Sequence, residues 1–388
     1  MNKAHYEKYF RGKNICVLGV GLLERQAKDI SFMASIGANI TVVCEHSKNK
    51  YKKVLQSLKR YKRNINYIFD NELAEDISSV DFILKGQGLA LEHSILQAAE
   101  KKSIPVYMSF GLFLSILKQE NIQVKTIGIT GTKGKATTTA MTAAILNQGD
   151  IPFHHVNNEP HSPILGLLKK VNKGDIVLAE LDSWELSGLH SVKLSPNLSI
   201  FTNFFEDHMD YYGGSMQAYF RDKSSVFRYQ SEEDNLLLSY NSSKAIKKYY
   251  RGKIYAHKHF ARFSQLPKSW SYKVFGKHNE QNLAFAYNIG LYLDIDPASI
   301  KEALSRFKAI EGRFQCIGTT TDDISFFNDS ASTTPEACIR SLQSLKKEYP
   351  DKRLILLAGG KNRDAHYQKM AKCIARNIDF TLLFSGTA

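Results

Sequence analysis

The 388-residue sequence has no long hydrophobic run. No window approaches the roughly 18 apolar residues of a membrane-spanning helix. The first residues, MNKAHYEKYFRGKN, are polar, whereas a signal peptide needs an apolar segment there. We therefore expect a cytoplasmic protein, and the length predicts two or three domains.

Cysteine is scarce. The five cysteines form no CxxC pair: Cys16, Cys44, Cys316, Cys338 and Cys373. This spacing argues against a cysteine-bound metal and against a disulfide framework. We expect reduced thiols that are partly buried.

Acidic residues are in the minority, since 52 Lys and Arg face 38 Asp and Glu, for a net charge of +14. Such a balance fits a nucleic acid, an anionic small substrate or a merely solvated surface. The lysines are spread, with one local run, KNKYKKVLQSLKRYKR, on an expected helix. Without zinc-finger spacing or a ribonucleoprotein aromatic motif, we expect small-molecule partners, no nucleic acid, no membrane and a monomer.

Apolar strand-like runs alternate with helical patterns along the chain, without internal repeats. This alternation predicts an α/β fold with parallel sheets. Three units are expected: a Rossmann-like domain over 1–120, a P-loop ATPase-type domain over 121–308 and a second Rossmann-like domain over 309–388.

The first strand-like run ends in Gly19 and Gly21, but Glu24 takes the third place of a GxGxxG dinucleotide motif. The helix that follows could still hold a phosphate at its N-terminus. Glu45, at the end of the second strand, could accept a hydrogen bond from a hydroxyl. A simple tight turn is the alternative for this partial motif.

The stretch GITGTKGKATTT, residues 128–139, is a stronger phosphate motif. A buried strand leads into glycines whose backbone can wrap phosphates, and a helix N-terminus follows. Lys135 can contact the β- and γ-phosphates. Ala136 stands where such loops usually carry a hydroxyl for magnesium, and Thr137 or Thr138 could supply it instead. The predicted ATP loop is Gly131, Thr132, Lys133, Gly134, Lys135, Ala136 and Thr137.

Further stretches follow this loop in order: AELDSWEL (179–186), FTNFFEDHMDYYGGSMQAYFRDK (201–223), KHNEQNLAFA (277–286), EGRFQCI and FFNDSASTTPEA. Together they resemble the Mur ligase superfamily, the ATP-dependent amino-acid ligases of peptidoglycan synthesis and their folylpolyglutamate synthase relatives. The resemblance covers nearly the whole chain and implies the three-domain Mur ligase architecture, with ATP and Mg²⁺ as cofactors.

By this resemblance, Glu180 and His208 are magnesium positions, with Thr137 and a carbamylated Lys223 in support. Taken alone, Glu180 would as readily be a salt-bridge partner, His208 a structural histidine and Lys223 a surface lysine. Carbamylation needs a neutral amine, and burial of a lysine favours that form by lowering its pKa.

The resemblance also implies that Asn279 and Asn282 contact adenine or phosphates, and that Arg313 and Asp329 hold the γ-phosphate side and the ribose. Without it, Asp329 would more often cap a helix or turn. The expected catalytic residues are Lys135, His208, Lys223 and Arg313.

Within the family, the N-terminal unit is most similar to the D-glutamate-adding members. This implies UDP-N-acetylmuramoyl-L-alanine and D-glutamate as substrates and an acyl-phosphate intermediate. The residues expected at the UDP-substrate are Gly19, Gly21, Glu45, Lys85 and Gly88.

Several positions depart from the family's pattern. Asp182 replaces a serine, Ala331 a lysine, Arg363 a lysine and Asp364 a glycine, and KGQG (85–88) replaces Lys-Ser-Pro-Gly. The third domain is expected to be incomplete, because the chain ends at Ala388 before the segments that bind D-glutamate in the family. Two alternatives therefore stay open: a ligase for another amino acid or folate, and a degenerate ATP-binding protein without ligase activity.

Overall fold

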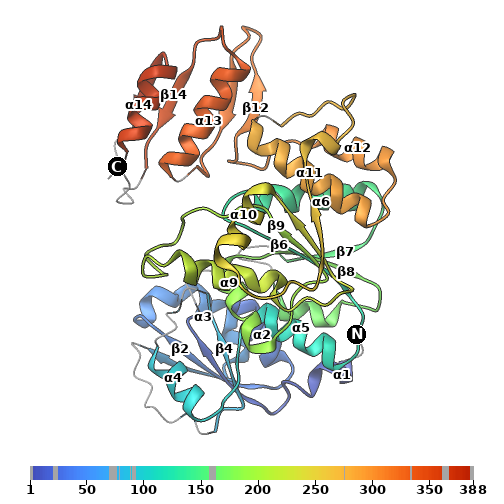
Figure 1. Ribbon diagram of the computed structural model, residues 1–388. Helices are drawn as coiled ribbons and strands as arrows, with labels where there is room; N and C mark the ends of the chain where they lie inside the picture. Colours follow the sequence, from blue (N-terminus) through green and yellow to red (C-terminus); the bar gives the residue numbers. More distant parts are fainter. Residues whose placement is uncertain are drawn as a thin grey trace. The chain divides into compact units, whose positions relative to one another are not determined.

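The structure, a computed structural model, describes residues 3–20, 25–69, 77, 79–87, 89, 93–156, 163–274, 276–332, 334–360 and 367–384. The chain groups into two compact units, 1–139 with 152–260 and 140–151 with 261–388. Figure 1 shows the helices and strands along the chain. The boundaries of the three expected domains stay a prediction.

The first unit begins with a parallel sheet of order β3-β2-β1-β4-β5. Its strands are β1 (Asn14–Leu18), β2 (Asn39–Cys44), β3 (Ile65–Phe69), β4 (Phe82–Lys85) and β5 (Val106–Tyr107), and its helices are α1 (Lys3–Glu7), α2 (Arg25–Ser35), α3 (Lys52–Leu58), α4 (Ser94–Lys101) and α5 (Ser109–Gln119). After β1 the chain forms β2 and β3 on one side of β1, and it then forms β4 and β5 on the other side of β1. The carboxyl ends of β1 and β4 therefore form the switch point where open α/β sheets bind ligands.

The first unit also holds a six-stranded parallel sheet of order β11-β10-β9-β6-β8-β7. Its strands are β6 (Lys125–Thr130), β7 (Phe153–Val156), β8 (Ile176–Glu180), β9 (Leu198–Phe201), β10 (Asn235–Leu238) and β11 (His257–Phe260). The helices between them are α6 (Lys135–Gln148), α7 (Ser183–Ser187), α8 (Leu189–Val192), α9 (Met216–Arg228) and α10 (Tyr240–Tyr249), with the 3₁₀ helix η3 (Leu165–Lys169). Since β6 lies between β8 and β9, the segments after these three strands meet at one edge.

Polar residues at the helix starts explain where several helices begin. The side chain of Ser215 accepts a hydrogen bond from the N–H of Ala218 and caps α9. Ser239 and Ser242 form a reciprocal capping box at the start of α10. These side chains satisfy backbone donors that a helix N-terminus leaves without partners.

The second unit contains, besides the later part of α6, a helical pair and two small sheets. Its elements are η4 (Phe263–Gln265), α11 (Lys277–Tyr292), α12 (Pro297–Arg306), β12 (Gln315–Thr319), β13 (Ser325–Asn328), α13 (Pro335–Glu348), β14 (Ile355–Ala358), α14 (Gln368–Asn377) and β15 (Phe380–Leu383). β14 and β15 pair in parallel, whereas β12 and β13 form an antiparallel hairpin.

The predicted α/β class with parallel sheets is confirmed. The basic run over residues 48–63 is not one helix: α3 covers its middle, between the 3₁₀ turns η1 (Lys48–Tyr51) and η2 (Lys59–Tyr61). Tyr51, Val54 and Leu58 bury the apolar side of this run. Among the described helices, none combines the length and apolar character needed to cross a membrane.

Candidate functional site

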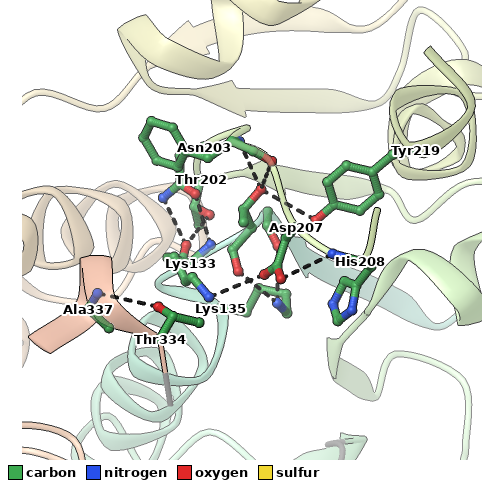
Figure 2. Close-up of polar contacts among 12 residues, drawn as sticks. Lys133, Lys135, Thr202, Asn203, Asp207, His208, Tyr219, Thr334 and Ala337 are labelled. Atoms are coloured by element: carbon green, nitrogen blue, oxygen red, sulfur yellow. Dashed lines mark hydrogen bonds and ion pairs between the residues drawn. The ribbon is translucent and has the colours of Figure 1, made fainter. Parts of the chain in front are cut away.

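The predicted phosphate loop connects β6 to α6, between the segments that follow β8 and β9. Gly131 and Gly134 have φ angles of +148° and +86°, which L side chains rarely adopt. The backbone N–H of Thr132 donates to the carbonyl oxygen of Asn203 at 3.0 Å, and the N–H of Lys133 donates to its Oδ1 at 2.8 Å. The segment after β9 therefore holds this loop in shape (Figure 2).

Thr202 and Asn203 were not among the predicted site residues. Thr202 Oγ1 and Asn203 Nδ2 both donate to the carbonyl oxygen of Lys133, each at 2.8 Å. Thr132 Oγ1 in turn donates to the carbonyl oxygen of Phe205 at 3.1 Å. The signal for these residues was present in FTNFFEDH, where a polar pair directly follows a buried strand.

Two lysines meet at the carbonyl oxygen of Gly131. Lys135 Nζ donates to it at 3.0 Å and Lys223 Nζ at 2.9 Å, although the two residues lie on different helices. Burial lowers the pKa of Lys135, while the charges of Glu180 and Asp182 oppose that effect. Two lysine Nζ donors at one phosphate loop suit a polyanionic ligand such as a nucleoside triphosphate.

Lys133 forms an ion pair with Asp207, with Nζ and Oδ2 separated by 3.2 Å (Figure 2). Burial acts to raise the pKa of Asp207, but the charge and hydrogen bond of Lys133, with the charge of Lys135, hold that pKa below its usual value. Asp207 thus stays ionised next to the loop and neutralises one of its lysines.

His208 directly follows Asp207 and has an unusual backbone, with φ at +56°. Its ring packs against Trp184, with ring centroids 4.7 Å apart. Burial lowers the pKa of His208, against the opposing charge of Asp207. The imidazole is therefore neutral near pH 7, the form in which histidine can bind a metal.

Glu180 is the last residue of β8, and only 9% of its surface is exposed. Asp182, a departure from the family's pattern, caps α7: its Oδ1 accepts a hydrogen bond from the N–H of Glu185 at 2.7 Å. Asp182 therefore caps this helix, as the serine found at this position in the family could also do.

Lys223 is fully buried on α9, with 1% of its surface exposed, and its Nζ lies 5.0 Å from the centroid of the Tyr219 ring. Burial lowers the pKa of Lys223 well below its usual range, and the charge of Lys135 acts in the same direction. The alternative of an ordinary surface lysine is wrong. The neutral amine that carbamylation requires is favoured at this position.

The threonines after Lys135 differ in their surroundings. Thr139 Oγ1 donates to the carbonyl oxygen of Lys135 at 2.9 Å, and Thr138 has no exposed surface. Thr137 and Ala136 are half-buried in the first turn of α6. This arrangement favours Thr137 over Thr138 as the source of the hydroxyl that Ala136 lacks.

Among the described residues, no three His, Cys, Asp or Glu side chains form a group that could hold a metal. The predicted set contributes only two such side chains, Glu180 and His208. Magnesium usually retains several waters and binds through one or two carboxylates and substrate phosphates. Glu180 and His208 would therefore suit a magnesium ion whose other ligands are phosphate oxygens and water.

We predict that Gly131→Ala destabilises the protein and its phosphate loop. A Cβ at Gly131 would lie 1.9 Å from Thr202 Oγ1, in a backbone region that already disfavours side chains. The expected loss in free energy of unfolding, measured by urea denaturation, is about 2–4 kcal/mol. Gly174→Ala is the matched control, because Gly174 has a φ of +90° but no atom within 4 Å of the added Cβ. Equal losses in the two variants would contradict the predicted clash.

At the switch point of the first sheet, the segments after β1 and β4 touch. Gly19 has a φ of +69°, and a Cβ at Gly86 would lie 1.9 Å from the carbonyl oxygen of Gly19. Glu45 is exposed at the end of β2. Lys85 is 4% exposed, and burial lowers its pKa against the opposing charge of Glu185. Gly21 and Gly88 lie outside the described residues.

The remaining predicted residues belong to the second unit. Asn282 Nδ2 donates to Asn279 Oδ1 at 2.9 Å, and both side chains are buried. Asp329 Oδ1 accepts a hydrogen bond from the N–H of Phe314 at 2.9 Å, and its Oδ2 accepts one from Ser341 Oγ at 2.6 Å. Arg313 is exposed. Their roles at the nucleotide stay predictions, and Arg363 and Asp364 lie outside the described residues.

The parallel sheet, the glycine loop and its converging lysines define a P-loop type of nucleotide-binding protein. Residues 129–283 match the Mur ligase middle domain, and residues 312–388 match the Mur ligase, glutamate ligase domain. The chain belongs to the Mur ligase family and is an ATP-dependent ligase of that family.

Curated relatives agree with this assignment. The chain is 26% identical over 404 residues to the UDP-N-acetylmuramoylalanine–D-glutamate ligase of Ligilactobacillus salivarius, covering 98% of this chain and 83% of the relative. It is 28% identical over 323 residues to the enzyme of that name from Aquifex aeolicus, covering 81% and 74%.

Among solved structures, the MurF ligase of Thermotoga maritima, in complex with ADP, has a TM-score of 0.57 at 13% identity, covering 99% of this chain and 85% of that one. The UDP-N-acetylmuramate–alanine ligase of Thermotoga maritima has a TM-score of 0.56 at 20% identity, covering 95% and 84%. These two similarities support the three-domain Mur ligase fold.

Proposed function

We propose that this chain joins D-glutamate to UDP-N-acetylmuramoyl-L-alanine at the expense of ATP, in the synthesis of peptidoglycan precursors. The observation that carries the ATP site is the convergence of Lys135 and Lys223 on the carbonyl oxygen of Gly131. The choice of substrates is supported by the similarity to the UDP-N-acetylmuramoylalanine–D-glutamate ligases of Ligilactobacillus salivarius and Aquifex aeolicus.

In the proposed reaction, a carboxylate oxygen of the substrate attacks the γ-phosphorus of ATP. The bond between the γ-phosphorus and ADP breaks, ADP leaves, and an acyl phosphate forms. The amine of D-glutamate then attacks the acyl carbon, loses a proton and displaces phosphate to form the amide. Lys135 stabilises the charge of the transferring phosphoryl group by position and electrostatics. The backbone N–H groups of Gly134 and Lys135 are proposed to bind phosphate oxygens, because those of Thr132 and Lys133 donate to Asn203. Arg313 is proposed to contact the γ-phosphate.

Magnesium, when bound, would neutralise phosphate charge and polarise the γ-phosphoryl oxygens. Glu180 and His208 are proposed to hold it, with Thr137 and carbamylated Lys223 in support.

In the N-terminal sheet, the segments after β1 and β4, together with Glu45, are proposed to bind the UDP-substrate. Asn279, Asn282 and Asp329 are proposed to contact the nucleotide. We propose that the protein works as a monomer in the cytoplasm.

The test is ADP release by the purified full chain, followed with mass detection of the amide product. We expect release only when UDP-N-acetylmuramoyl-L-alanine, D-glutamate, ATP and Mg²⁺ are all present. Release with a different amino acid would reassign the second substrate. Nucleotide binding without ADP release for any amino acid would contradict the proposal and favour a non-ligating protein.

A further inference from the structure

Glu185 is a buried carboxylate for which the proposed reaction has no role. It lies in α7, the helix that follows Glu180, and 3% of its surface is exposed. Its Oε1 accepts a hydrogen bond from the backbone N–H of Phe110 at 2.8 Å. Its Oε2 accepts one from Gln87 Nε2 at 3.0 Å. One carboxylate next to the ATP site thus holds two segments that follow strands of the N-terminal sheet.

Phe110 lies in the first turn of α5, which begins after Met108 without a side-chain cap. The first N–H groups of a helix have no partner within the helix, and they form its positive end. The carboxylate of Glu185 accepts the hydrogen bond from one of these groups, the N–H of Phe110, and a carboxylate is a stronger acceptor than a neutral oxygen. The packing is close here, because a Cβ at Gly111 would lie 2.9 Å from the carbonyl oxygen of Gly188.

Gln87 belongs to the segment after β4; we name its described residues, Gly86, Gln87 and Leu89, the acceptor loop. It lies at the switch point, where the N–H of Gly86 donates to the carbonyl oxygen of Leu18 at 2.7 Å. Tyr211 Oη donates to the carbonyl oxygen of Leu89 at 3.2 Å. The acceptor loop is therefore held from two sides, by the segment after Glu180 and by the segment after His208.

We propose that Glu185 is a positioning residue, whose carboxylate fixes the acceptor loop and the start of α5 relative to the ATP loop. The consequence for catalysis rests on the proposed function, because the substrate carboxylate must meet the γ-phosphorus in line. A displacement of about 1 Å in such a reaction can cost about 100-fold in rate. The structural part of the proposal, that Glu185 holds the two segments, depends only on its hydrogen bonds to Phe110 and Gln87.

Two substitutions separate the hydrogen bonds from the bulk of the side chain. We expect Glu185→Ala to lower kcat for ADP release by about 10- to 100-fold, with KM for ATP changed less than about twofold. In Glu185→Gln, Oε1 can still accept from Phe110, and the amide of Gln87 can turn to accept from the new Nε2. We therefore expect Glu185→Gln to keep kcat within about threefold of the wild type.

Gln87→Ala is a milder second variant, because it removes one of the two hydrogen bonds from a partly exposed loop. Its effect on kcat should not add to that of Glu185→Ala in the double variant, since both act through one contact. Glu233→Ala, at an exposed turn, is the matched control and should behave as the wild type. Additive effects of Gln87→Ala and Glu185→Ala would overturn the shared contact.

Hydrogen exchange of the full chain without nucleotide tests the contact independently of activity. We expect the amide of Phe110 to exchange faster in Glu185→Ala than in the wild type, and to stay protected in Glu185→Gln. Unchanged exchange in Glu185→Ala overturns the inference, as does wild-type kcat in that variant. Absence of ADP release by the wild type with the proposed substrates is a separate result, which overturns the proposed function.

Discussion

Lys135→Ala is expected to reduce ATP-dependent ADP release by about 100- to 1000-fold, the range seen when a positioned group that stabilises transition-state charge is removed. Lys135 Nζ already lies 3.0 Å from the carbonyl oxygen of Gly131. Burial lowers the pKa of Lys135, and negatively charged phosphates bound beside it would raise that pKa and favour the ammonium form. The measurement is kcat and KM for ATP in the ADP-release assay.

Two controls accompany this substitution. Ala136→Ser adds the hydroxyl that such loops usually carry, and we expect a change in turnover of less than about threefold, because Thr137 is available in the same turn. Lys170→Ala removes an exposed lysine and should leave activity unchanged. If the wild type were inactive and Ala136→Ser gave it activity, the loop of the wild type would be non-functional. That result would contradict the predicted role of Lys135.

The parts of the site that depend on local sequence were predictable. The run KTIGIT before the glycines indicated a buried strand, and the structure places β6 and the phosphate loop there. The α/β alternation gave both parallel sheets of the first unit. Local signals suffice in these places because a strand, a glycine turn and a helix start each depend on neighbouring residues.

The parts that depend on distant contacts were not predictable. Asn203 can bond to the phosphate loop only because β6 and β9 are neighbours in the sheet. No local sequence pattern predicts that these two strands pair. The burial of Lys85 near the charge of Glu185 likewise depends on distant contacts, and its expected role at the UDP-substrate stays a prediction. The antiparallel pairing of β12 and β13 was missed for the same reason, since an alternating pattern of strands and helices favours parallel neighbours.

Lys223→Arg is the second substitution with a large expected effect. Arginine keeps the positive charge and can donate to the carbonyl oxygen of Gly131, but it cannot form a carbamate. If Lys223 acts as a carbamate that supports magnesium, Lys223→Arg should lower kcat by about 100-fold or more. If it acts as an ammonium group, the variant should retain much of its activity. The ADP-release assay separates these roles.

The carbamate itself can be observed by ¹³C NMR of the full chain in ¹³C-bicarbonate. Carbon dioxide reacts with the neutral amine, and burial lowers the pKa of Lys223 so that this form is available near neutral pH. As the pH falls, protonation of the amine competes with carbamate formation, so the labelled signal and the activity should decline together. Lys223→Arg should lack the signal at every pH. A wild-type enzyme that turns over fully without the signal would show that the two converging lysines serve only as cations.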